Sequence, residues 1–307
     1  MRRFFGLAAI AALAVTGPAV AQNQDPGREI IRGILDGLLG PEPEAEQVDD
    51  EEVEFEGTRM EQVLAHSRRN DDRARDEHRH PGETLEFFRI EQGMTVVDFM
   101  PSSGWYSRVL IPYLGSSGTY IGLNPQIPEE GPGFFQSMRN YNQTLPGQAR
   151  DWVGYSGARV IGANVGEIPE ELEGTVDRFL VFREIHNIRR FGWFHDVAVA
   201  ARSLLKEGGL VGVVQHRTGN NAPASYVLGD NGYQREQDVI ALFSAYGFDL
   251  VARSEVNANP RDPANWEGGV WSLPPVYGGA PEGSEERARR AEIGESDRMT
   301  LLFRKRP

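Results

Sequence analysis

Polar side chains stand at the ends of a series of short apolar segments in this chain. They are a carboxylate, two amides, two imidazoles and their neighbours: Asp98, Asn124, Asn164, His186 with Asn187, and His216 with Arg217. Amides and a carboxylate can bind the hydroxyls and base of a nucleoside, and an imidazole can transfer a proton. Each residue alone is typical of a cap or turn. Their recurrence at five segment ends favours a common binding crevice at one sheet edge, provided that the segments are parallel strands.

One of these ends is followed by a turn that suits ligand binding. The apolar run that begins at Met94 stops at Asp98, passes through Pro101, Ser102, Ser103 and Gly104, and resumes as an aromatic-apolar pattern with helical spacing. This order predicts a strand, a tight loop and a helix. A helix N-terminus favours polar or anionic groups, and glycine lets a ligand approach the backbone. Turns of this kind also occur without any ligand.

The elements that would position these residues alternate along the chain. Strands are predicted at residues 94–99, 119–123, 160–163, 176–182, 210–214, 249–254 and 299–303, and helices at 105–114, around 134–145, 194–205 and 236–246. This alternation predicts an α/β fold with a Rossmann-like, mostly parallel sheet and helices on both faces. Before the first strand, we expect a surface helix over residues 58–79 with Thr58 as its cap, and a second helix opening at Pro81.

Composition narrows the possible partners. The 307-residue chain has a formal net charge of −13 and no cysteine. Nine of its acids fall within residues 42–56, which contain no base, and no basic stripe of the kind that binds nucleic acid is present. We therefore expect a small-molecule substrate and no nucleic acid. No metal site is expected either, because His78 and His80 are two residues apart and would point to different helix faces.

The first residues have the pattern of a secretory signal peptide. Residues 1–21 contain Arg2 and Arg3, an apolar run over 4–15 and small residues before a cleavage site. The run is shorter than the roughly 20 residues that span a bilayer, so no stable membrane insertion is expected. This predicts an exported protein, periplasmic or extracellular, by either the general or the twin-arginine route. Residues 22–57 are predicted to be a weak helix and a disordered acidic linker, and residues 58–307 the functional domain.

Several unusual motifs follow one another along the chain in an order known from other proteins. They are RDEHRHPGETL at 75–85, GMTVVD at 93–98, PSSGWY at 101–106, LKEGG at 205–209, VQHR at 214–217, SEVNANP at 254–260 and GESDRMT at 294–300. With them the chain, from about residue 68 to its end, resembles class I S-adenosylmethionine-dependent methyltransferases. Within that class it is similar to a group of exported bacterial proteins that are themselves predicted methyltransferases.

The resemblance implies a cofactor site for S-adenosylmethionine. The residues expected to hold its methionine part are Asp98, Pro101, Ser102, Ser103 and Gly104. Asn124 takes the place where an acid usually binds the ribose, and Asn164 the place next to the adenine. Two departures from the family pattern, Ser102-Ser103 in place of glycines and Asn124 in place of the acid, imply a lower affinity for the cofactor.

The resemblance also suggests roles around the acceptor. His186, Asn187 and His216 are the candidate catalytic residues, as a base or to orient the acceptor. Tyr106, Arg217, Trp266 and Trp271 are the candidate substrate contacts, the last two on a lid over residues 256–275. Tyr106 is equally typical of a core residue, and the tryptophans can instead anchor their loop.

Three functions stay open at this point. The first is methyl transfer to a small molecule or envelope component, although export would take the protein away from S-adenosylmethionine unless it leaves the cell folded around it. The second is a non-catalytic periplasmic binding protein for a small ligand. The third, a hydrolase, ranks lowest because the chain has no Gly-x-Ser-x-Gly motif and no zinc-ligand spacing. The acceptor and the oligomeric state do not follow from the sequence.

Overall fold

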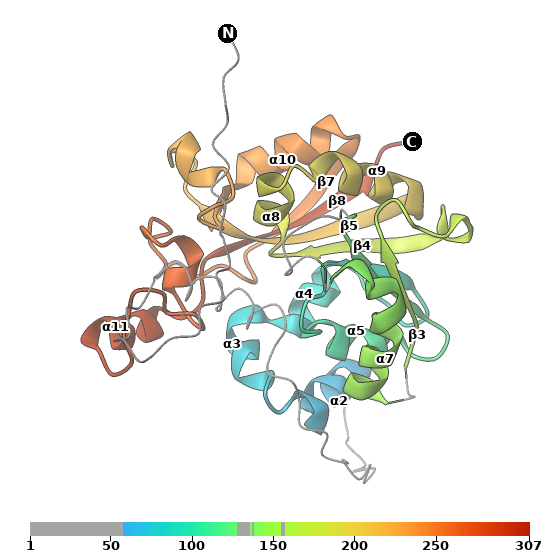
Figure 1. Cartoon of the computed structure of the whole chain (residues 1–307), viewed down its shortest axis with the longest axis horizontal. Helices are drawn as coiled ribbons and strands as arrows, with labels where there is room; N and C mark the ends of the chain where they lie inside the picture. Colours follow the sequence, from blue (N-terminus) through green and yellow to red (C-terminus); the bar gives the residue numbers. More distant parts are fainter. Residues whose placement is uncertain (1–57, 128–135, 137, 155–156) are drawn as a thin grey trace, which may run out of the picture.

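The core of the fold is one sheet of mostly parallel strands (Figure 1). A computed structural model describes residues 58–127, 136, 138–154 and 157–307. The strands are β1 Thr95–Phe99, β2 Thr119–Asn124, β3 Arg159–Asn164, β4 Val176–Phe182, β5 Leu205–Thr218, β6 Gln234–Arg235, β7 Phe248–Ser254 and β8 Arg298–Lys305. Their order is β3-β2-β1-β4-β5-β8-β7, and β6 pairs with β5 outside this path. Strands β1 to β5 are parallel, and β8 runs antiparallel between β5 and β7. The predicted fold class is therefore confirmed.

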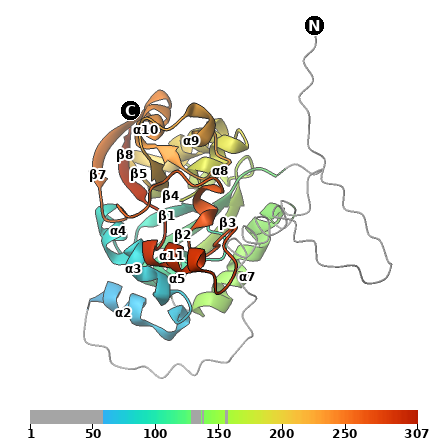
Figure 2. The same ribbon diagram turned by 90° about the vertical axis from the view of Figure 1, so that its left-hand side faces the viewer.

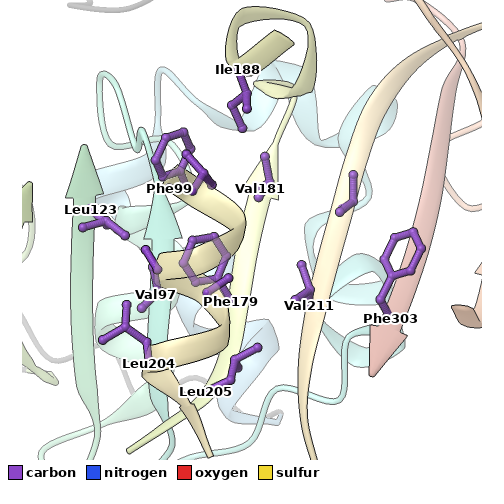
Figure 3. Close-up of a cluster of buried hydrophobic side chains, with 14 of the residues drawn as sticks. Val97, Phe99, Leu123, Phe179, Val181, Ile188, Leu204, Leu205, Val211 and Phe303 are labelled. Carbon is purple, nitrogen blue, oxygen red and sulfur yellow. The ribbon is translucent and has the colours of Figure 1, made fainter. Parts of the chain in front are cut away.

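Helices cover both faces of the sheet (Figures 1 and 2). The helices are α4 Pro81–Phe87, α5 Ser107–Leu114 and α7 Tyr141–Val153 on one face, and α8 Ile185–Arg190, α9 Phe194–Leu204 and α10 Glu236–Ala245 on the other. Neighbouring residues of β1 show why both faces are apolar, because Val96 belongs to one core cluster and Val97 to the other, and neither is exposed. Figure 3 shows Val97 among the side chains of its cluster. Strands buried on both sides are typical of parallel sheets.

The segment before the sheet differs from the expected single helix over residues 58–79. It consists of α2 Arg59–Ala65, the 3₁₀ turns Ser67–Arg69 and Arg73–Arg75, and the short α3 Asp76–Arg79. Thr58 caps α2 in a capping box with Glu61, as its sequence suggested. The helix stops because His66 adopts an extended conformation and its Nδ1 accepts the backbone N–H of Arg68.

Three further elements differ from the prediction. Strand β5 extends to Thr218, so His216 and Arg217 lie within the strand and not after it, because β8 continues to pair with β5 as far as His216. Helix α8 follows β4 directly, and Ile185 and Ile188, three residues apart, are its buried contacts. The connection between β7 and β8 contains α11 Glu285–Ile293, which the sequence had not suggested.

Some predictions lie outside the described residues. These are the signal peptide over residues 1–21, the linker over 22–57, and the start of the helix expected around 134–145. The described helix of that region is α7, which begins at Tyr141. Among the described residues, no helix is long and apolar enough to cross a membrane.

Close contact between α7 and the sheet yields a test of the fold. A Cβ added at Gly162 of β3 would lie 2.4 Å from the carbonyl oxygen of Tyr141 and 2.8 Å from Cα of Asn142. Gly162→Ala should therefore displace α7 and lower the free energy of unfolding by about 1–3 kcal/mol in urea titrations. Gly147→Ala is the control, since a Cβ there meets nothing within 4 Å. This substitution should stabilise α7 by about 0.5–1 kcal/mol. Equal effects of the two substitutions would contradict this packing.

Candidate functional site

The turn between β1 and α5 has an unusual backbone. Met100, Ser102 and Gly104 all have positive φ, at 53°, 55° and 79°. Hydrogen bonds hold this conformation, because Gly104 N donates to Pro101 O at 3.0 Å and Met100 N donates to Leu123 O at 2.8 Å. Left-handed residues other than glycine cost about 1–3 kcal/mol each and cluster at functional sites. The strained turn therefore marks the carboxyl end of β1 as a candidate site.

The role of Gly104 in the structure is packing. A Cβ at this position would lie 2.7 Å from the ring of Trp152 on α7. The open side of the glycine is therefore covered by an aromatic ring of the protein itself. Its expected role in letting a ligand approach the backbone stays a prediction.

Asp98 is buried just inside the end of β1. Only 1% of the residue is exposed, and one carboxylate oxygen accepts a hydrogen bond from the Tyr120 hydroxyl at 2.9 Å. The same hydroxyl lies 2.7 Å from Ser107 Oγ. Burial raises the pKa of Asp98 from 3.8 to about 7, against the lowering effect of the Tyr120 hydrogen bond, and the nearby Glu184 raises it further. Asp98 thus changes charge close to neutral pH.

Asn124 and Asn164 lie side by side at the ends of β2 and β3. They are register partners, and both are nearly fully buried. Asn124 also shares a sheet face with Asp98, because Gly122 pairs with Asp98 and Asn124 lies two residues further along the strand. Asn164 donates to Arg139 O at 3.0 Å, whereas its Oδ1 has no partner among the described residues. The structure brings the predicted carboxylate and both amides to one face and one edge.

The two candidate bases also lie close together. His186 and His216 are buried, with ring centroids 5.8 Å apart. Gln215 Nε2 approaches His186 Nδ1 at 3.4 Å, and His216 Nδ1 is 2.6 Å from Ser296 Oγ. Burial lowers the pKa of His186 to about 3 and holds the pKa of His216 well below its usual value. Both rings are neutral at pH 7, the form in which imidazole accepts a proton.

Asn187, the third candidate catalytic residue, is part of a local contact on α8. Its Nδ2 donates to Glu184 Oε2 at 2.8 Å. This hydrogen bond lowers the pKa of Glu184, but burial has the larger effect and raises it to about 7. Asn187 therefore acts on its neighbouring carboxylate in the structure, and its catalytic role stays a prediction.

The four candidate substrate contacts fall in two places. Tyr106 is buried and stacks on Phe182 at 3.6 Å between ring centroids, and Trp271 packs edge-on against His186 at 5.8 Å. Both lie beside the polar edge. Arg217 and Trp266 instead contact carboxylates of the protein. Arg217 pairs with Asp297, Glu255 and Glu236, and Trp266 donates to Asp262 at 2.9 Å. Of the proposed lid over residues 256–275, the part around Trp271 thus reaches the histidines.

The structure adds a group of residues that the sequence had not singled out. A small cavity at the same edge is lined by Arg79, Tyr106, Phe182, Arg183, Val214, Asn257 and Arg298. Arg79, Asn257 and Arg298 belong to three of the recurring motifs, at 75–85, 254–260 and 294–300. These motifs meet in space, because Asn257 Nδ2 donates to Thr84 Oγ1 at 2.9 Å and Arg298 Nη1 to His78 O at 3.0 Å. The charged and amide residues shared by these motifs were the signal by which the sequence could have indicated this cavity.

Comparisons with known proteins give structural neighbours only. No protein-family model and no curated protein matches the chain. The geranyl diphosphate C-methyltransferase from Streptomyces coelicolor A3(2) is 14% identical over 93% of this chain and 100% of its own, with a TM-score of 0.48. A second geranyl diphosphate methyltransferase, in complex with SAM, is 12% identical over 81% and 96%, with a TM-score of 0.46. A SAM-dependent methyltransferase from Aquifex aeolicus is 17% identical over 61% and 89%, with a TM-score of 0.43.

The buried carboxyl of Asp98 predicts a pH-dependent stability. Because its pKa is higher in the folded protein than the ordinary value of 3.8, folding favours the protonated form, and stability is lost as the pH rises from about 4 through about 7. Asp98→Asn removes this charge and can still accept the Tyr120 hydrogen bond. Its stability relative to the native chain should therefore improve by about 2–3 kcal/mol between pH 5 and pH 8 in denaturant titrations.

Asp151→Asn, at an exposed position of α7, is the matched control. It should change the free energy of unfolding by less than about 0.5 kcal/mol at either pH. An Asp98→Asn variant whose stability difference is the same at both pH values would show that the carboxyl is not desolvated as described.

Proposed function

We propose that this protein transfers a methyl group from S-adenosylmethionine to a small molecule. The observation that carries the proposal is the placement of Asp98, Asn124 and Asn164 on one face at the carboxyl ends of β1, β2 and β3. The chain leaves β1 on one side toward β2 and β3 and returns on the other side as β4 and β5. Ligands of open α/β sheets bind at such a switch point. Of the three residues, Asp98 belongs to the motifs that resemble methyltransferases.

The residues at this edge suit the nucleoside part of the cofactor. The Oδ1 of Asn164 has no donor among the described residues, and an adenine amino group can supply one. Asn124, its register partner, can bind ribose hydroxyls. The strained turn over residues 100–104 would hold the methionine part, and the Tyr120 hydroxyl, which contacts both Asp98 and Ser107, links β1 before the turn to α5 after it. When bound, the cofactor supplies an electrophilic methyl group on a sulfonium.

The chain's own contribution to the reaction is to hold and orient the acceptor. His186 lies in the first turn of α8, which follows β4, and His216 lies in β5, and burial keeps both rings neutral. With its pKa held this low, each ring is a weak base at neutral pH and suits a hydrogen bond that orients the acceptor. Trp271, which packs against His186, would exclude water from this side.

A second function, ligand binding without methyl transfer, is favoured by one observation. The turn that would hold the methionine part is closed at Gly104 by Trp152, and the Asp98 carboxyl lies behind Tyr120. A protein of this kind would use the same edge for a nucleoside-like ligand.

We further propose that the chain is exported, periplasmic or extracellular, on the basis of residues 1–21. A fusion of these residues to a reporter active only outside the cytoplasm tests the export.

Calorimetric titration tests the cofactor site. The purified protein should bind one molecule of S-adenosylmethionine, and S-adenosylhomocysteine should compete for the same site. Asn164→Ala should weaken the binding of both about tenfold, since it removes a buried hydrogen-bond acceptor. Asn142→Ala, at an exposed position of α7, should leave the affinity unchanged.

The outcomes separate the two functions. Binding of neither compound up to millimolar concentration contradicts the methyl-transfer proposal. Tight binding of adenosine, together with failure of S-adenosylmethionine to compete, supports the binding protein instead.

A further inference from the structure

A small cavity lies beside the proposed cofactor edge, over β4, β5 and β8. Phe182 and Val214, which are register partners, both line it, and Arg298 pairs with His216 two residues further along β5. Tyr106 closes it from the β1–α5 turn. The centre of a water molecule can occupy about 10 Å³ of this cavity, so it has room for about one water.

Three arginines line the cavity, and the nearby carboxylates of Glu295 and Glu184 neutralise their charge in part. Arg79 and Arg298 are each 2% exposed, and Arg183 is half-buried. One carboxylate, that of Glu295, serves Arg79 and Arg298 and also pairs with Arg75 at 2.6 Å. Arg183, with φ of 63°, lines the cavity in a conformation that non-glycine residues rarely adopt. Three guanidinium groups therefore surround a space that contains no acid of its own.

Two N–H groups of this cluster have no acceptor. Nη2 of Arg79 and Nε of Arg298 are buried and without a hydrogen-bond partner in the described part of the chain. A buried donor without an acceptor destabilises the folded state, and charged donors do so most. Burial and the neighbouring arginines lower the pKa of Arg79, and they lower that of Arg183 to about 10. A bound anion would satisfy the donors and remove the repulsion.

We propose that the Arg79–Arg183–Arg298 cavity binds a carboxylate group of the methyl acceptor. This rests on the proposed function for the identity of the ligand, while the anion site follows from the cavity alone. A guanidinium matches a carboxylate in shape, and a cavity with room for about one water admits a single carboxylate oxygen more readily than the bulkier phosphate. The cavity lies over β4, β5 and β8, where Arg298 pairs with His216, and away from Asn124 and Asn164 on β2 and β3, which favours the acceptor. Because Tyr106, which follows the turn proposed for the methionine part, also lines the cavity, competition with S-adenosylmethionine is part of the test.

Ligand-observed NMR with propionate tests the site on the whole protein. Saturation transfer to propionate is expected without any cofactor, and inorganic phosphate at equal ionic strength should not displace it. Arg183→Gln should weaken propionate binding about tenfold, as loss of a charged hydrogen-bond donor does. In chloride buffer the same variant should have a higher thermal midpoint than the native chain, because it removes repulsion between buried cations. Arg253→Gln, at an exposed position of β7, is the control and should bind propionate normally.

Each outcome decides a separate point. Absence of saturation transfer, or equal transfer to propionate in the Arg183→Gln variant, overturns the anion site. Displacement of propionate by phosphate overturns the carboxylate specificity of the site. If Arg183→Gln does not fold, Arg183→Lys, which keeps the charge but loses the planar fork, should still weaken binding. Displacement of propionate by S-adenosylmethionine would assign the cavity to the carboxylate of the cofactor. Propionate binding by a protein that binds no S-adenosylmethionine would retain the anion site and reject the methyl-transfer function alone.

Discussion

The buried carboxylate of Glu295 joins distant parts of the described chain. It pairs with Arg75 and Arg79 near the start of the described residues and with Arg298 at the start of β8. Removing one partner from such a buried ion pair typically costs about 3–5 kcal/mol, because the remaining charges stay uncompensated. This cluster therefore fixes the segment before α4 over the edge formed by the carboxyl end of β5 and the start of β8. Without it, the proposed acceptor side of the site would have no closed wall.

The sheet separates two kinds of chemistry on either side of the β1–β4 switch point. The ends of β2 and β3 carry the neutral amides Asn124 and Asn164, which suit the hydroxyls and base of a nucleoside. On the other side, α8 after β4 carries His186 and β5 carries His216, both neutral, and the arginine cluster lies beside them with β8. Between them lies Asp98, whose pKa near 7 reflects burial more than any charged partner. Burial has the largest effect on the pKa of Asp98, Glu184, His186 and His216, whereas the arginines lower the pKa of Glu295 in spite of its burial.

The sequence was most informative where periodicity is strong. The strand pattern alone predicted β4 at its observed bounds and the convergence of Asp98, Asn124 and Asn164, because parallel strands must end at one edge. It failed where tertiary pairing decides the structure: β5 continues through His216 because β8 pairs with it there, and nothing local in the sequence signals that partner. The helix expected over residues 58–79 breaks at His66 for a similar reason, since that segment turns back so that Arg69 and Arg79 pack against Trp105. The arginine cavity was missed because its residues come from segments far apart in the sequence.

Hydrogen–deuterium exchange with and without S-adenosylhomocysteine is the most direct test of the central claim, that the cofactor binds at the ends of β1, β2 and β3. Binding there should slow exchange in the peptides that contain residues 100–106, 124–127 and 164–167, with little change in those that contain α11 or β7. Slower exchange confined to other parts of the protein, or none at a concentration that saturates binding, would contradict it.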